Sequence, residues 1–238
     1  MNIKDTIGQP DDDNEKNRQP QLAPYLKFYS DNSLHIDPQP LYGNWTQGFA
    51  LDLHTTSSHP LKDAEGNNIR DENGKIKWDT KYTLTGDEMH KLKYRREHYR
   101  IPKLATTASS FIKCYLNEWQ LSCIIPIPPS DTTRLFQPVI KLAEAIGNLC
   151  NLQVNDEVLK KVKSTTQLKD IEDPDRRRVL LEGVFDTPQN SLTGRNILLF
   201  DDLYRSGETL KAAAQILKNK GAAKNVYILT ITKTRSKR

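Results

Sequence analysis

The stretch ILLFDDLYRSGET (residues 197–209) joins a run of apolar residues to two adjacent aspartates, and then to a short turn of small and hydroxylated residues. A continuous apolar run of this length is typical of a strand that is buried on both faces of a parallel sheet. Apolar residues then recur at helical spacing over residues 210–217, which predicts a helix after the turn. Asp201 and Asp202 are therefore expected at the carboxyl end of a buried strand, directly before the N-terminus of a helix.

Strand and helix patterns alternate on both sides of this stretch. Residues 121–128 have the composition of a short buried strand, and residues 134–150 have a helical period. Gly221 can end the helix that follows the aspartates, and residues 225–232 supply the next apolar run. This βαβα order predicts a parallel α/β sheet with right-handed crossovers. Such sheets bind ligands at the carboxyl ends of their strands, where the two aspartates are expected.

The N-terminal part of the chain has a different composition. Residues 1–21 are polar and rich in Asp, Asn, Gln and Pro, so we expect a flexible tail. Residues 22–85 contain short aromatic and aliphatic runs separated by turn signals, which predicts a small β-rich section. Within it, the Gly-Asn and Asn-Gly dipeptides of residues 63–75 predict a protruding hairpin or a long polar loop.

A helical region is predicted to follow the β-rich section. Thr85 and Glu88 have the spacing of a capping box, so we expect the helix to start there. Pro102 is expected to break or kink this helix before a second helical stretch, which runs to about Trp119.

Composition limits the classes of protein that fit. The chain has 238 residues and three cysteines, an odd number without C-x-x-C spacing, which argues against a disulfide framework or a zinc knuckle and favours a cytoplasmic protein. It shows neither an apolar signal core nor a segment long enough to cross a membrane, so we expect a soluble protein without a membrane partner. The net charge of +5 favours anionic partners, either phosphates or nucleic acid.

The turn after the two aspartates has the composition of an anion site. Ser206, Gly207 and Thr209 would place backbone N–H groups and hydroxyls at a helix N-terminus, where the helix dipole favours negative charge. Carboxylates repel phosphate but accept hydrogen bonds from a sugar diol, so the two elements together favour a ribose 5-phosphate group. Taken alone, two acids after an apolar strand favour a capped turn or the acidic cluster of a receiver-like domain over a ligand site.

Residues 197–209 resemble the 5-phosphoribosyl 1-pyrophosphate (PRPP) binding signature of type I phosphoribosyltransferases. Tyr204 and Arg205 depart from it, since a smaller aliphatic residue and a small or hydroxylated residue are usual there. Further segments extend the resemblance to the ComF-type phosphoribosyltransferases. These are the basic LKYRRE (residues 92–97), the IIPIPPSDTTRLF strand and loop (residues 124–136), and the threonine-glutamine, basic and Gly-x-Phe elements of residues 160–185.

The resemblance implies an α/β fold: a type I phosphoribosyltransferase-like parallel sheet flanked by helices in residues 86–238, with residues 22–85 as a small β-rich N-terminal cap. The cysteine pairs that form an N-terminal zinc ribbon in many ComF-type proteins are absent from this sequence, so no zinc is expected.

The resemblance also implies an enzymatic reaction, in which PRPP binds with Mg²⁺, a nitrogen acceptor takes the 5-phosphoribosyl group, and pyrophosphate leaves. Asp201 and Asp202 are then the catalytic acids and the candidates for direct contact with Mg²⁺. The 5-phosphate would lie on the turn, at Arg205, Ser206, Gly207, Glu208 and Thr209. The pyrophosphate would be held by the loop after residues 124–128 and by a mobile basic hood over residues 160–178, through Ser130, Arg134, Lys163 and Arg177.

Asp52 and His54 are candidates for the acceptor site. They alternate with apolar residues in one predicted strand and therefore share a face. The same spacing is compatible with a structural Asp-His pair that touches no substrate.

Two classes of function remain open at this point. The first is an active transferase, and the second is a regulatory module that binds PRPP or a nucleotide without turnover, which the departures at Tyr204 and Arg205 favour. A weaker third hypothesis is contact with DNA through the basic run at residues 90–103, in line with the ComF family's link to DNA uptake. The sequence does not identify the acceptor, and a homodimer is compatible with the resemblance.

Overall fold

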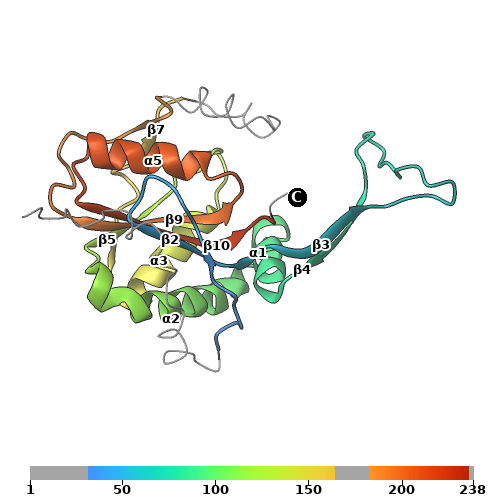
Figure 1. Cartoon of the computed structure of the whole chain (residues 1–238), viewed down its shortest axis with the longest axis horizontal. Coiled ribbons are helices and arrows are strands. Elements are labelled where there is room, and N and C mark those ends of the chain that lie inside the picture. The colour runs from blue at the N-terminus through green and yellow to red at the C-terminus, as the bar shows by residue number, and fades with distance from the viewer. Residues whose placement is uncertain (1–31, 164–182, 236–238) are drawn as a thin grey trace, which may run out of the picture.

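The computed structural model describes residues 32–163 and 183–235 of the protein. The described residues form a central six-stranded sheet with helices on both faces, and a hairpin projects from one end (Figure 1). The strands of the central sheet, in spatial order, are β1 (Gln39–Pro40), β2 (Gln47–Leu53), β10 (Asn225–Lys233), β9 (Asn196–Tyr204), β5 (Cys123–Pro126) and β6 (Gln153–Val154).

The pairings from β2 through β10, β9 and β5 to β6 are all parallel, whereas β1 pairs with β2 antiparallel at one edge. The longest ladder joins β10 to β9, from Asn225 opposite Asn196 to Lys233 opposite Tyr204. Because neighbouring parallel strands end at the same edge of a sheet, β2, β10 and β9 bring their carboxyl ends together. The predicted α/β class with a parallel central sheet is confirmed.

Helices cover both faces of this sheet. Helix α5 (Glu208–Asn219) lies on one face, and α2 (Ile101–Trp119) and α3 (Pro138–Cys150) lie on the other (Figure 1). Helix α1 (Leu84–Tyr94) contacts β2 and β10, and a short 3₁₀ helix (His98–Arg100) joins it to α2. Strands β7 (Lys160–Lys161) and β8 (Phe185–Asp186) form a separate antiparallel pair.

The two faces of the sheet bury separate hydrophobic cores. On β9, Leu198 and Phe200 pack into the core on the side of α2 and α3, whereas Ile197 and Leu199 pack into the core on the side of α5. This continuous burial explains the uninterrupted apolar run in the sequence. The strand alternation carries the next two residues of β9 to opposite faces of the sheet.

Strand β2 lies inside the central sheet, between β1 and β10, although its residues fall in the section 22–85 that the sequence assigns to an N-terminal cap. Phe49, Ala50 and Leu51 are fully buried, and they alternate between the two cores. Asp52 and His54 follow this buried stretch at the carboxyl end of the strand. Part of the β-rich section therefore completes the main sheet.

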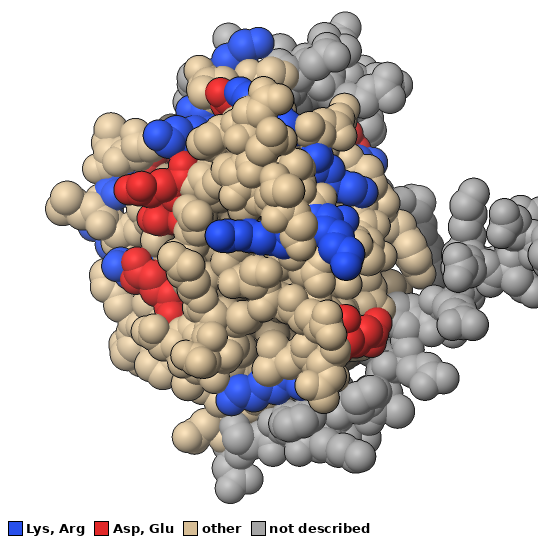
Figure 2. All heavy atoms as spheres, turned by 90° about the vertical axis from the view of Figure 1, so that its left-hand side faces the viewer, with Lys and Arg blue, Asp and Glu red and all other residues tan. Residues whose placement is uncertain are grey.

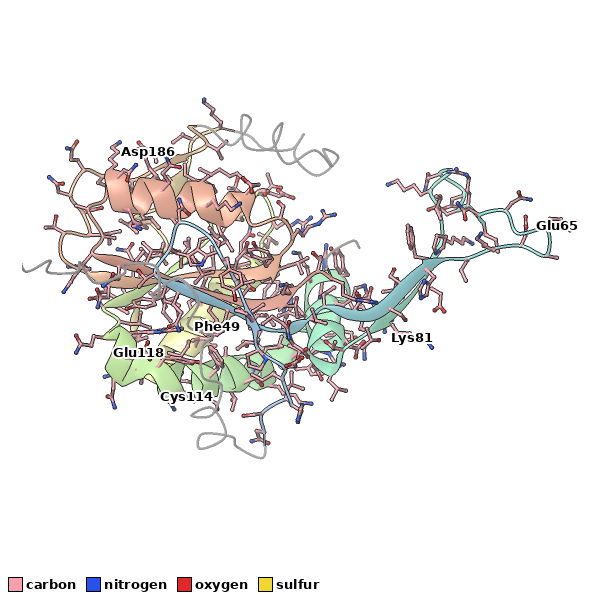
Figure 3. All side chains as sticks on the ribbon, in the orientation of Figure 1. Phe49, Glu65, Lys81, Cys114, Glu118 and Asp186 are labelled. Atoms are coloured by element: carbon pink, nitrogen blue, oxygen red, sulfur yellow. The ribbon has the colours of Figure 1, made fainter. Side chains whose placement is uncertain are left out.

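The remainder of the β-rich section forms the projecting hairpin. Strands β3 (Thr55–Pro60) and β4 (Trp78–Tyr82) pair antiparallel, and Glu65 lies at the far end of the loop between them, away from the body of the protein (Figure 3). Asp63 and Asp71 each accept backbone hydrogen bonds from the residues two and four positions later, which fixes two successive turns. The predicted protrusion over residues 63–75 is confirmed.

The start of α1 differs from the predicted capping box at Thr85. The N-cap is Thr83, whose hydroxyl accepts a hydrogen bond from the Gly86 N–H at 2.9 Å. Glu88 pairs with Arg100 at 2.6 Å instead of reaching back to a cap. The helical region does break before α2, but over residues 95–97, and Pro102 lies in the first turn of α2, where its missing N–H costs nothing.

Figure 2 shows the side of the molecule opposite the hairpin. Lys and Arg side chains on this side are separated by uncharged surface and by Asp and Glu side chains, so they do not merge into one continuous basic face. Among the helices of the described residues, none has the length and apolar character that crossing a bilayer requires.

Candidate functional site

The two aspartates lie at the carboxyl end of β9, between the ends of β5 and β10. Asp202 is turned toward α1, and its Oδ2 accepts a hydrogen bond from Lys93 Nζ at 2.5 Å. Asp201 occupies the next position back along β9, and its own Oδ1 accepts the N–H of Asp202 at 2.8 Å. The pair therefore presents one carboxylate to each side of the strand, as the alternation of the chain requires.

A cleft of about 450 Å³ opens directly over these carboxylates. The loop after β5, the turn after β9, the first turn of α5, the end of α1 and Lys161 of β7 line it. Most of the residues that the sequence selects come together in its wall: Asp201, Asp202, Arg205, Ser206, Gly207, Glu208, Thr209, Ser130 and Arg134. The two acids, the turn and the loop after β5 therefore lie around one cleft, as we expected. The role of each residue stays a prediction.

Of the other selected residues, three described ones are not in this wall and the fourth is not described. Lys163 is described but is not among the residues that line the cleft. Arg177, like most of the proposed hood, lies outside the described residues. Asp52 and His54 also do not line the cleft.

The turn after β9 leads into α5 through Gly207, which has a left-handed backbone with φ of +79°. The backbone ladder of α5 starts with the N–H of Lys211, which donates to the Gly207 carbonyl at 2.8 Å. The N–H groups of the first helical turn precede this ladder, so they are available to an anion. Glu208 lies in the same turn, and its carboxylate pairs with Lys211 Nζ at 2.7 Å.

Tyr204 packs against this turn. A Cβ atom added at Gly207 would come within 2.5 Å of the Tyr204 hydroxyl oxygen. Burial is the main reason why the pKa of Tyr204 is raised. The large side chain that departs from the PRPP-binding signature therefore forms part of the wall of the turn.

The opposite wall is the loop after β5. The N–H of Ile127 donates to the Phe200 carbonyl at 2.8 Å, which continues the pairing of β5 with β9 and fixes the start of the loop. Further along, Arg134 Nε pairs with Asp131 at 3.0 Å, and Ser130 Oγ accepts a hydrogen bond from Lys161 Nζ at 3.0 Å. Two cations therefore lie in the wall that faces the aspartates.

The electrostatics of the site depend on burial and on two lysines. Burial, followed by repulsion from Asp202, raises the pKa of Asp201 to about 7. The hydrogen bond from the Asp202 N–H, and then the positive charges of Lys93 and Lys161, limit this rise. Burial alone would lower the pKa of Lys93, but attraction to Asp202 and Asp201 outweighs it and the pKa is raised. Lys93 is therefore charged at neutral pH, whereas Asp201 gains and loses its proton near neutrality.

His54 reaches the site only indirectly. Its Nδ1 lies 3.0 Å from Thr232 Oγ1, and this hydroxyl donates to the backbone carbonyl of Asp202 at 3.4 Å. Burial lowers the pKa of His54, so the ring is neutral at pH 7. Asp52 accepts the N–H of Leu53 at 2.7 Å. Neither residue lines the cleft, and His54 is linked to Asp202 only through Thr232, so their role at an acceptor site stays a prediction.

The cleft is also lined by residues to which the sequence analysis gave no specific role at the site. Lys93 lies in the LKYRRE segment, which the sequence identified as a basic helix without assigning it to the acids. Lys161 falls within the predicted hood, whereas Lys163 and Arg177 were selected there. Tyr94 and Asp131 also line the cleft, and no local pattern marks them.

No group of three or more His, Cys, Asp or Glu side chains is placed to hold a metal ion in residues 32–163 and 183–235. Asp201 and Asp202 are the carboxylates that could contact a Mg²⁺ carried in by an anionic ligand, and one of them is paired with Lys93. Carboxylate oxygens suit Mg²⁺, which usually keeps one or two protein carboxylates together with ligand phosphates. The residues present therefore fit a ligand-borne metal better than a permanently bound one.

The chain is 34% identical over 133 residues to a curated protein of Bacillus subtilis (strain 168) that is named Competence protein ComFC. The match covers 53% of this chain and 50% of that protein, so the chain spans about half the length of the curated relative it matches. No family model matches the chain.

Proposed function

We propose, starting from the confirmed resemblance of this chain to the ComF family, that it is a phosphoribosyltransferase with the type I fold. It would bind PRPP together with Mg²⁺ and transfer the 5-phosphoribosyl group to a nitrogen acceptor, with release of pyrophosphate. The observation that carries the proposal is the placement of two carboxylates and a helix N-terminus in one cleft, which Arg134 of the loop after β5 and Lys161 of β7 also line.

Each wall of the cleft has a task in this proposal. Asp201 and Asp202 accept hydrogen bonds from the ribose hydroxyls, and the first turn of α5 binds the 5-phosphate. Arg134 and Lys161 attract the pyrophosphate, whose charge grows as the bond to the anomeric carbon breaks. Mg²⁺, when bound with PRPP, supplies further neutralisation of the leaving pyrophosphate.

Purified protein incubated with PRPP, Mg²⁺ and a panel of bases and amines tests the proposal directly. We expect pyrophosphate release that depends on one class of acceptor. Binding of PRPP without pyrophosphate release from any acceptor would contradict the transferase and favour the second function below. Absence of PRPP binding by the folded protein would contradict both.

The second function is a sensor that binds a phosphoribosyl ligand without turnover and regulates a partner. Tyr204 favours the sensor, because the PRPP-binding signature has a smaller residue at this position. The Tyr204 ring packs against the turn and so narrows the space for the proposed 5-phosphate. Steady turnover with any free base would exclude a purely sensing role.

Replacement of Gly207 by alanine tests the turn. Alanine at this left-handed position costs about 1 kcal/mol of stability, and its methyl group would also collide with Tyr204. We therefore expect a modest loss of stability together with loss of PRPP binding measured by calorimetry. Gly194→Ala is the matched control, since Gly194 has a φ of +72° and no atom within 4 Å of its added Cβ. If the two variants bind PRPP equally well, the turn at Gly207 does not bind the 5-phosphate.

The raised pKa of Asp201 predicts pH-dependent binding. The carboxylate must be ionised to act as a charged acceptor, so lowering the pH from 8 to 6 through a pKa of about 7 reduces the binding-competent fraction roughly tenfold. We expect the PRPP affinity of the wild type to rise with pH over this range. Asp201→Asn should bind PRPP more weakly, and its affinity should depend less on pH. This comparison distinguishes the titration of Asp201 from the titration of the phosphates of PRPP. An unchanged slope in the variant would contradict the assignment.

A further inference from the structure

The ion pair between Lys93 and Asp202 occupies one carboxylate of the proposed sugar site. The two charged atoms lie 2.5 Å apart, and only 8% of the Asp202 side chain and 30% of the Lys93 side chain are exposed. A charge-assisted hydrogen bond in so sheltered a position is strong, because little water competes for either partner. A cation supplied by the chain itself therefore already contacts Asp202.

The position of Lys93 is fixed by the packing of α1. Met89 and Leu92 of this helix are buried in the core on the side of α2 and α3, and the Thr83 cap fixes its N-terminus. Lys93 follows Leu92 directly, and its ion pair with Asp202 holds the ammonium group at the end of β9. The ammonium group is thus held at the site before any ligand arrives.

Lys161 is a second lysine near the two acids. It lines the same cleft, its ammonium group donates to Ser130 Oγ at 3.0 Å, and its charge lowers the pKa of Asp201. Two carboxylates therefore share the cleft with two lysines, so charge balance at the acids does not require a divalent ion.

We propose that Lys93 is the resident cation of the two acids, and that the ribose phosphate part of the ligand binds there without a divalent metal. The proposal rests on the proposed function and refines it: Mg²⁺ is required for the pyrophosphate part of PRPP and for its departure, but not for recognition of the sugar phosphate. Lys93 acts through Asp202, so it is a positioning residue.

Calorimetry with ribose 5-phosphate, which lacks the pyrophosphate, tests this proposal in EDTA and in excess MgCl₂. We expect wild-type affinities that agree within about twofold in the two conditions. Lys93→Met should bind ribose 5-phosphate about tenfold more weakly than the wild type in EDTA, because Asp202 loses the charge-assisted contact with Lys93 that positions it. Added Mg²⁺ should restore much of this affinity. Lys93→Arg should keep metal-independent binding. Lys91→Met is the matched control, because Lys91 lies on the same helix but pairs with Asp87.

A second measurement needs no organic ligand. Electron paramagnetic resonance of added Mn²⁺ should detect no binding to the acids in the wild type or in Lys93→Arg, and binding in Lys93→Met. Loss of ribose 5-phosphate binding by the wild type in EDTA, unchanged binding by Lys93→Met, or tight Mn²⁺ binding by the ligand-free wild type would each overturn the proposal. If no variant binds ribose 5-phosphate under any condition, the proposed function fails, and the Mn²⁺ titrations still decide whether Lys93 is the resident cation.

Discussion

Replacement of both Asp201 and Asp202 by asparagine is expected to abolish PRPP binding while the protein remains folded. Asparagine keeps the shape of each side chain but removes the charge, and each charge-assisted hydrogen bond to a ribose hydroxyl contributes about 1.5–3 kcal/mol. The loss of two such bonds weakens binding at least about a hundredfold. Calorimetric titration of the wild type and the double variant with PRPP and Mg²⁺ measures the effect.

The chain offers a matched control for this double exchange. Asp156 and Glu157 are also adjacent acids, and both are exposed and absent from the lining of the cleft. Asp156→Asn with Glu157→Gln removes the same charge and should bind PRPP as the wild type does. If the two double variants bind equally well, the acids at the end of β9 do not hold the sugar.

Single exchanges at the two acids should affect stability in opposite directions. Burial raises the pKa of Asp201, so its ionised form costs stability above its pKa, and Asp201→Asn should leave the thermal midpoint unchanged or higher at pH 8. Asp202→Asn leaves Lys93 without its carboxylate in a largely buried position, and we expect a lower midpoint. Thermal unfolding of both single variants therefore also checks that lost binding by the double variant does not reflect unfolding.

Phe49→Ala is expected to have the largest effect on stability, about 3–5 kcal/mol. Phe49 of β2 is fully buried, and its ring contacts the rings of Phe111, Tyr115 and Trp119 of α2 at centroid distances of 5.2, 5.4 and 6.3 Å. Alanine removes the ring and leaves a cavity that the neighbouring aromatic residues cannot fill without leaving their own contacts. Denaturant unfolding followed by circular dichroism measures the change.

Tyr42→Ala provides the comparison for this measurement. Tyr42 precedes β2 in the same part of the chain, but the residue is 72% exposed, so its removal should change stability by less than about 0.5 kcal/mol. If residues 47–53 were a detachable cap, Phe49→Ala would lower the stability of that cap only, and the main unfolding transition would be retained. A single weakened transition is expected instead, because β2 lies within the sheet.

The parts of the fold that the sequence predicts well are those determined locally. The apolar run of β9, the spacing within α5 and the adjacent position of the two acids all lie within one short stretch, so the site at its end follows from the stretch itself. The PRPP-binding interpretation of this stretch still depends on the resemblance, since neither burial nor charge identifies a substrate.

Features that depend on contacts between distant segments were missed. No residue near Lys93 in the sequence indicates that α1 packs beside the end of β9, where Lys93 contacts Asp202. A basic helix in the sequence is also typical of a helix face that is exposed to solvent. The buried part of β2 is too short to be distinguished from an ordinary hairpin strand until β10 pairs with it. The cap at Thr83 was missed because Thr85 has a more regular capping pattern, whereas the position of the preceding strand decides which hydroxyl meets the helix.

The order of strands has a consequence for how the protein is made. Strand β2 comes early in the chain and β10 comes close to its end, yet the two pair directly, and β10 also pairs with β9. During translation, β2 cannot pair with β10 until the residues between them and β10 itself have left the ribosome. Until then, Phe49 and its neighbours lack their partner strand, so a chain cut short before β10 would expose aggregation-prone surface.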